Sequence, residues 1–174
     1  MDATNKPGAG QASGFEFIIS RVFDAPRELM WKMWTDPAHI ARWWGPKGST
    51  VKHCDMDLRL GGMCHYRLDF PPGEDMWGRL VYREIEPPSK LVFIVSFSDP
   101  NRGVTVHPMN PDWPREVLST VTFAERGGKT EVTIRWQAFN ATDLERKTFE
   151  EGRDSMRQGW TGSLDQLEAH LAEV

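Results

Sequence analysis

The feature that most constrains this fold lies between residues 50 and 139, where short apolar segments alternate with turn signals. The segments are rich in β-branched and aromatic residues, and Gly-Gly or Pro-containing turns separate them, which is typical of an antiparallel meander. Six strands are expected, at residues 51–58, 63–70, 77–85, 90–97, 116–124 and 130–139. The chain should therefore form mainly one antiparallel sheet.

Two short helices are expected ahead of this meander. Residues 15–23 mix aromatic and β-branched side chains and predict a first strand, which ends at a helix-start signal. A helix should follow over about residues 26–34, and Asp36 and Pro37 should cap and begin a second helix. The pair has no basic recognition face, so we interpret it as a buried plug between the sheet and its loops.

The C-terminal segment predicts one long amphipathic helix. Thr142 and Glu145 form a capping box, and an apolar stripe at helical spacing runs from Phe149 to Leu171. Such a helix is roughly 40 Å long. Three glycines within it, Gly152, Gly159 and Gly162, each cost about 1 kcal/mol relative to Ala. They indicate close approach of the helix backbone to a neighbour, either the sheet or a ligand.

Composition limits the other possibilities. Residues 1–13 are small and polar and predict a flexible leader, so a single domain is expected at residues 14–174. The net charge is -4, and the cations are spread among carboxylates, so nucleic acid is not an expected partner. No signal peptide and no membrane-spanning run is visible, which predicts a cytoplasmic protein without membrane contact.

Several short motifs carry a family resemblance. They are FDAP at residues 23–26, TDP at 35–37, RWWGP at 42–46, LGG at 60–62, IEPPSKLVF at 85–93 and QGW at 158–160. Over about residues 15–172, the chain resembles the Activator of Hsp90 ATPase homologue (AHSA1-like) group of the START-like, or SRPBCC, superfamily. The resemblance implies an α+β helix-grip (START-like or Bet v1-like) fold. In that fold a curved antiparallel sheet of about seven strands wraps around a long C-terminal helix, with two short helices after the first strand.

A cavity for an apolar ligand is the main functional expectation. The START-like resemblance implies such a cavity, and eight Trp and nine Phe could line it or could simply fill the core. The residues expected to line it are Trp44, Tyr66, Phe93, Val95, Trp136, Met156 and Trp160. The proline-rich loop at residues 98–115 could close one end as a lid with Met109 and Trp113, or could cover an exposed core edge.

Catalytic and redox chemistry are harder to support from the sequence. The five histidines form no metal, nucleophile or phosphate motif, so neither metal nor cofactor is expected. The strand at 77–85 could turn Arg79 and Arg83 inward, or Leu80 and Tyr82 with Glu84. A two-residue turn at Leu60–Gly61 would place Cys54 and Cys64 on opposite faces, so no disulfide is expected.

Three functions follow from these observations. The preferred hypothesis is a binding protein for a hydrophobic or aromatic small molecule, more consistent with a non-enzyme. The second is a stress-response accessory protein of an Hsp90-type chaperone, as the family name implies, although the chain resembles only the START-like part of the eukaryotic co-chaperones. The third is a polyketide cyclase- or dehydratase-like enzyme, in which Arg79, Arg83, Tyr66 or His65 would supply the polar groups. Both a monomer and a homodimer are compatible with the sequence.

Overall fold

The computed structural model describes residues 12–70 and 73–174. The strands are β1 (Ala12–Phe23), β2 (Thr50–Met56), β3 (Met63–Phe70), β4 (Glu74–Glu86), β5 (Lys90–Ser98), β6 (Val104–Thr105), β7 (Glu116–Arg126) and β8 (Lys129–Phe139). The helices are α1 (Arg27–Thr35), α2 (Pro37–Trp43), α3 (Asp143–Glu151) and α4 (Arg153–Leu171). The predicted leader lies outside the described residues except for its last two positions, which belong to β1.

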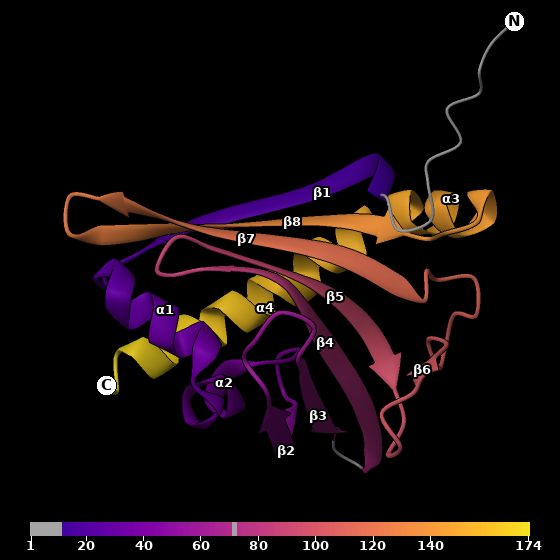
Figure 1. The fold of residues 1–174 in the computed structure, drawn as a ribbon, viewed down its shortest axis with the longest axis horizontal. Helices are drawn as coiled ribbons and strands as arrows, with labels where there is room; N and C mark the ends of the chain where they lie inside the picture. Colours follow the sequence, from indigo (N-terminus) through magenta and orange to yellow (C-terminus); the bar gives the residue numbers. More distant parts are fainter. Residues whose placement is uncertain (1–11, 71–72) are drawn as a thin grey trace, which may run out of the picture.

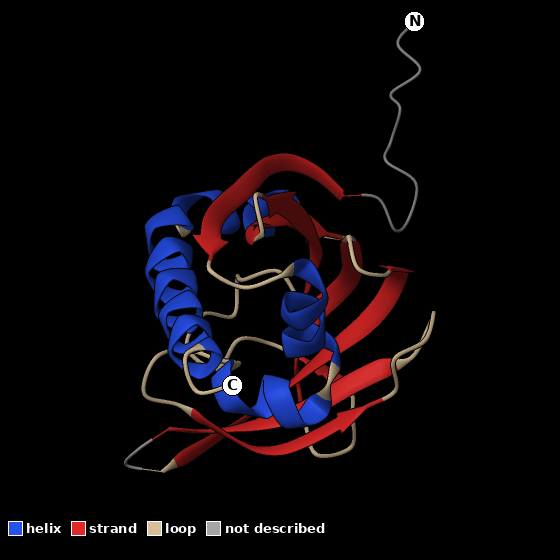
Figure 2. Ribbon diagram, turned by 90° about the vertical axis from the view of Figure 1, so that its left-hand side faces the viewer, coloured by secondary structure: helices blue, strands red, loops and turns tan. Residues whose placement is uncertain are grey.

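The strands form one antiparallel sheet in the order β1-β8-β7-β5-β4-β3-β2, and the short β6 pairs with the end of β5. The sheet curls around α4, which crosses its concave side, while α1 and α2 close one end (Figures 1 and 2). This architecture confirms the predicted α+β helix-grip fold. The eighth strand, β6, was not predicted because it is only two residues long and lies within the 98–115 loop.

The second short helix forms for the reason that its sequence indicated, whereas α1 begins after Pro26 without a side-chain cap. The Asp36 side chain accepts a hydrogen bond from the Ala38 backbone N–H at 2.9 Å, and Pro37 occupies the first turn of α2. The Trp43 indole then donates to the Met33 carbonyl at 2.9 Å, which joins α2 to α1. A local cap and a buried hydrogen bond thus help to hold the two helices together.

The C-terminal helix differs from the prediction of a single helix. The capping box is present, with the Glu145 N–H donating to Thr142 Oγ1 at 3.1 Å and the Thr142 N–H donating to Glu145 Oε1 at 2.9 Å. The helix is interrupted at Gly152, which separates α3 from α4. An added Cβ at Gly152 would lie 2.8 Å from the Trp113 ring, so the interruption coincides with close contact from the long loop.

The pairing of β3, β4 and β5 settles which face of β4 points inward. Leu80 and Tyr82 are buried on the concave side, opposite Val95 and Phe93 of β5. Arg79 pairs with His65 on the convex side, and Arg83 is exposed. A register shift between Tyr82 and Glu84 leaves Glu84 exposed as well, so neither predicted set of inward residues is complete.

The two cysteines share a face, contrary to the prediction. The β2–β3 connection is not a two-residue turn but spans residues 57–62, so Cys54 lies opposite Tyr66 and Cys64 lies opposite Met56. Positions two residues apart on paired strands point to the same side of a sheet. The two Sγ atoms are therefore only 3.8 Å apart, and both thiols are free.

No helix in the described ranges is both long and apolar enough to cross a membrane.

Candidate ligand cavity

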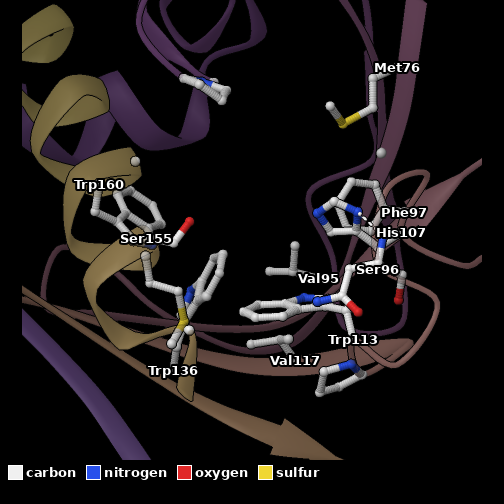
Figure 3. Close-up of a pocket in the computed structure, with 18 of the residues that line it drawn as sticks. Met76, Val95, Ser96, Phe97, His107, Trp113, Val117, Trp136, Ser155 and Trp160 are labelled. Atoms are coloured by element: carbon white, nitrogen blue, oxygen red, sulfur yellow. Dashed lines mark hydrogen bonds between the residues drawn. The ribbon is translucent and has the colours of Figure 1, made fainter. Parts of the chain in front are cut away.

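A cavity of about 740 Å³ lies between the concave side of β3–β5, the N-terminal half of α4 and the loop before β7. Figure 3 shows Trp136 and Trp160 on one side of it, facing Val95, His107 and Trp113 across open space. Volumes of this size accept a small organic ligand with most of its surface buried. The curved sheet and α4 are thus separated enough at this end to leave room for one.

Trp160 on α4 marks the inner limit of the cavity. Its ring is stacked with that of Trp34 at a centroid distance of 6.2 Å, and it meets Trp44 and Trp136 edge-on at 5.8 and 5.5 Å. The Trp136 indole N–H is already used, because it donates to Ser119 Oγ at 2.9 Å. These rings therefore offer mostly apolar faces and edges to a ligand.

Trp44 is positioned by polar groups on α4. The Ser163 hydroxyl donates to the Gly45 carbonyl at 2.6 Å, and the Gln166 amide donates to the carbonyls of Trp43 and Gly45, both at 3.0 Å. These bonds hold the segment after α2 against the helix. The Trp44 ring is thereby fixed at the cavity wall, where it meets Tyr66 edge-on at 5.9 Å.

The Tyr66 ring lies over Gly78 on the neighbouring strand. The two residues are direct partners in β3 and β4, and a Cβ at Gly78 would come within 2.3 Å of the phenol. The absence of a side chain at residue 78 is therefore what allows Tyr66 to lie flat against the wall. Burial raises the pKa of Tyr66 to about 12, so the phenol is neutral near physiological pH.

The loop at residues 98–115 contributes Trp113 to the cavity wall but not Met109. Trp113 borders the cavity and contacts Phe149 at a centroid distance of 5.4 Å, whereas Met109 is 87% exposed and is not among the lining residues that the structure describes. Of the two residues expected to form a lid, only Trp113 is placed at the cavity. Whether the loop moves as a lid stays a prediction.

His107 is a polar group in this wall. Its Nδ1 accepts hydrogen bonds from the backbone N–H groups of Met109 and Asn110 at 3.0 and 3.2 Å, so the ring proton resides on Nε2. The ring lies between Phe97 and Trp113, with Nε2 turned toward the open space (Figure 3). Burial lowers the pKa of His107, which favours this neutral donor form.

The three helical glycines separate into two kinds. Gly152 and Gly162 face close neighbours, because an added Cβ would lie 2.8 Å from Trp113 and 3.1 Å from the Lys47 side chain. Gly159 lines the cavity, and an added Cβ there would meet nothing within 4 Å. Packing therefore accounts for two of the glycines, whereas the third borders the space that a ligand would occupy.

The expected lining residues can now be compared with the structure. Trp44, Tyr66, Val95, Trp136, Met156 and Trp160 border the cavity. Phe93 differs: it is buried against Tyr82 at a centroid distance of 6.2 Å and is not one of the described lining residues. Sequence reasoning did not predict Met76, Gly78, Phe97 and His107 as lining residues. The only signal for any of them was the proline-rich 98–115 loop, which contains His107 and was considered as a possible lid.

The polar residues considered for catalysis do not converge. His65 is buried on the convex side, stacked on Trp77 at 4.8 Å, and its Nε2 lies 2.9 Å from the Asp99 carbonyl. Arg79 donates to the Arg102 carbonyl at 2.8 Å on that same side. Of the four candidates only Tyr66 borders the cavity. The described residues also contain no group of three or more His, Cys, Asp or Glu side chains arranged to hold a metal ion.

The curved sheet around a long helix defines the chain as a helix-grip domain of the START-like class. Residues 24–172 match the family described as Activator of Hsp90 ATPase homolog 1-like protein, and the chain belongs to this family. Among curated proteins, none matches the sequence significantly.

Solved structures of bacterial proteins share the fold. One from Rhodobacter sphaeroides has a TM-score of 0.75 at 21% identity, covering 95% of this chain and 97% of that one. One from Arthrobacter aurescens has a TM-score of 0.73 at 26% identity, covering 94% and 92%. The AHSA1 protein from Silicibacter pomeroyi has a TM-score of 0.65 at 22% identity, covering 91% and 98%. At these identities the likeness concerns the architecture.

Proposed function

We propose that this protein binds a small, neutral, largely aromatic molecule in the cavity beneath α4. The observation that carries the proposal is the combination of about 740 Å³ of space with a wall of tryptophan, tyrosine and phenylalanine rings. Concave pockets of this volume with mainly apolar and aromatic walls are typical of small-molecule sites, and exposed ring faces there lack contact partners. A ligand would supply the missing contacts.

The charge of the lining supports a neutral ligand. Among the described lining residues there is no Lys or Arg, and the one carboxylate is that of Glu151, which is exposed. An anionic group would therefore find no cation inside the cavity and would leave water at a cost. An uncharged ring system is favoured instead.

His107 adds one polar requirement to the ligand. Its Nε2–H is a donor at an otherwise apolar wall, because Nδ1 is already occupied by two backbone N–H groups. A donor that loses water on ligand binding needs an acceptor in return. The ligand class we propose is thus an aromatic molecule with a ketone, ester or ether oxygen at one end.

The test uses 6-propionyl-2-(dimethylamino)naphthalene, a neutral fluorophore with a ketone, beside 2-(dimethylamino)naphthalene, which lacks it. Both should bind the wild-type protein, measured by fluorescence titration. His107→Phe should weaken binding of the ketone by roughly three- to tenfold, the effect of losing one hydrogen bond, and leave the second probe unchanged. Equal effects on both probes would contradict the role of His107.

A second variant tests the cavity itself. Gly159→Leu should block binding of both probes, because its side chain would extend into the open space that Gly159 borders. Thr161→Leu is the matched control for added surface apolarity: Thr161 is exposed on the same helix and is not a described lining residue. Unchanged binding in a folded Gly159→Leu protein would overturn the proposal.

A further inference from the structure

The cysteine pair on β2 and β3 lies beside the ligand cavity, but neither cysteine is among its described lining residues. Cys54 and Cys64 lie two residues apart in register on adjacent strands, on the same face of the sheet, with their sulfur atoms 3.8 Å apart. The hairpin that joins them is closed by a hydrogen bond from the Asp57 N–H to the Met63 carbonyl at 2.9 Å. The backbone thus holds the two thiols together without a covalent bond.

The two thiols have different surroundings. Cys54 is partly exposed on the edge strand β2, whereas Cys64 is buried. The hydrogen bond from the Cys64 thiol stabilises a Cys54 thiolate and lowers the pKa of Cys54, while the same hydrogen bond, together with burial, raises the pKa of Cys64. One sulfur is therefore suited to attack an oxidant from solvent, and the other is a protonated partner within reach.

We infer that Cys54 and Cys64 form a reversible dithiol–disulfide modification site, in which Cys54 reacts with a hydroperoxide and Cys64 resolves the product. Accessible thiols beside a second cysteine are the usual pattern of such sites. The sulfur atoms need to approach from 3.8 Å to the roughly 2.05 Å of a disulfide. Diagonal positions on paired strands place the Cα atoms about 7–8 Å apart, so the edge strand β2 has to shift toward β3 as the side chains rotate.

The reaction balances with a hydroperoxide as the oxidant. The Cys54 thiolate attacks the outer peroxide oxygen, the O–O bond breaks, and the alcohol leaves after taking up a proton, so that Cys54 becomes a sulfenic acid. The Cys64 sulfur then attacks the Cys54 sulfur. The S–O bond breaks, and the oxygen leaves as water with the Cys64 proton. Two thiols are oxidised while one hydroperoxide is reduced to an alcohol and water.

Intact-protein mass spectrometry of the full chain tests this assignment. After treatment with one equivalent of tert-butyl hydroperoxide, the wild-type protein should lose two hydrogen atoms in mass, remain monomeric on non-reducing electrophoresis, and recover its mass with dithiothreitol. Cys64→Ala should instead accumulate a Cys54 sulfenic acid that dimedone traps. Cys54→Ala should show neither product under the same conditions, because the remaining thiol is buried.

The reactivity of Cys54 tests whether Cys64 activates its thiol or only lies close to it. The pH profile of iodoacetamide alkylation at Cys54 should shift to higher pH in Cys64→Ala, because the hydrogen bond that stabilises the thiolate is gone. Cys64→Ser, which keeps a hydroxyl donor, should restore part of the wild-type profile. The inference is overturned if wild-type protein gains oxygen at Cys54 without forming the intramolecular disulfide, or if Cys64 is oxidised first.

Discussion

The two ends of the space enclosed by the sheet and α4 are built differently. Under α1 and α2 the space is filled: Met30 and Met33 have no exposed surface, and Trp34 packs on Trp43, Trp44, Phe123 and Trp160. Beyond Trp160 the space opens into the cavity of about 740 Å³, with aromatic rings on several sides (Figure 3). Trp160 belongs to both ends.

The difference follows from residue size along α4. Its C-terminal half carries Leu164 and Leu167, both fully buried, whereas its N-terminal half presents Met156 and Gly159 to the cavity. Large residues on both the helix and the plug fill one end, and a glycine at the other end leaves space unfilled. The filled end should therefore determine stability and the open end binding.

The largest expected effect is in the filled end. Trp34→Ala should lower the free energy of unfolding by about 3–5 kcal/mol, because it removes a large ring that four aromatic neighbours surround. Chemical denaturation measures this loss. Trp113→Ala, in the half-buried loop at the open end, should cost clearly less. A similar loss in both variants would show that the two ends do not differ in this way.

A second effect is expected at Gly78, where the cavity wall is closely packed against the Tyr66 ring. Gly78→Ala places a methyl group within 2.3 Å of the Tyr66 ring, so the ring has to move away from β4. Overpacking of this kind costs about 1–3 kcal/mol. Denaturation should show that loss, and probe titration should show weaker binding, since Tyr66 forms part of the wall. Unchanged probe affinity in a destabilised protein would argue that Tyr66 does not contact the ligand.

Gly159→Ala is the counterpart of Gly78→Ala, because it adds the same methyl group at a cavity position that has open space around it. The methyl group meets nothing within 4 Å, and alanine favours a helix over glycine. The free energy of unfolding should rise by up to about 1 kcal/mol. Probe binding should change little, unlike in Gly159→Leu. If Gly159→Ala destabilises the protein, residue 159 is more crowded than the structure indicates.

The smallest effect concerns pH and compares one histidine from each end. Burial lowers the pKa of His170, with the nearby His39 and Arg42 adding to the shift, and burial alone lowers that of His107. The unfolded chain then binds protons first as the pH falls below about 6.5, so stability declines until the pH passes below the folded pKa values.

Melting temperatures at about pH 7.5 and about pH 5 measure this decline. His170→Asn should reduce the difference between the two melting temperatures more than His107→Asn, because His39 and Arg42 add to the effect of burial at His170, whereas burial alone acts on His107. His170 also shares a 3.0 Å hydrogen bond with His39, so its replacement changes stability at every pH. The melting temperature at the higher pH is therefore the baseline for each variant. Equal slopes in all three proteins would exclude both histidines as the cause.

Much of the architecture could be predicted because its signals are local. The cap at Asp36, the capping box at Thr142 and the alternation in β7 and β8 act within a few residues, and each produced the expected element. The errors arose where a distant contact decided the outcome. Trp113 lies against Gly152 and coincides with the break between α3 and α4, which no periodicity along the helix could indicate.

The sequence alone determined the order of most elements and the aromatic character of the interior, since both follow from composition and short-range pattern, and it indicated the class of fold through its family resemblance. Only the tertiary structure decided that Cys54 and Cys64 share a face, that Arg79 lies on the convex side and that His107 joins the cavity wall. The six-residue connection between β2 and β3, the pairing of β4 with β3 and the fold of the 98–115 loop produce these outcomes. The first two depend on strand register, in which a one-residue difference reverses every side chain, and the third depends on how the loop packs against the sheet and α4.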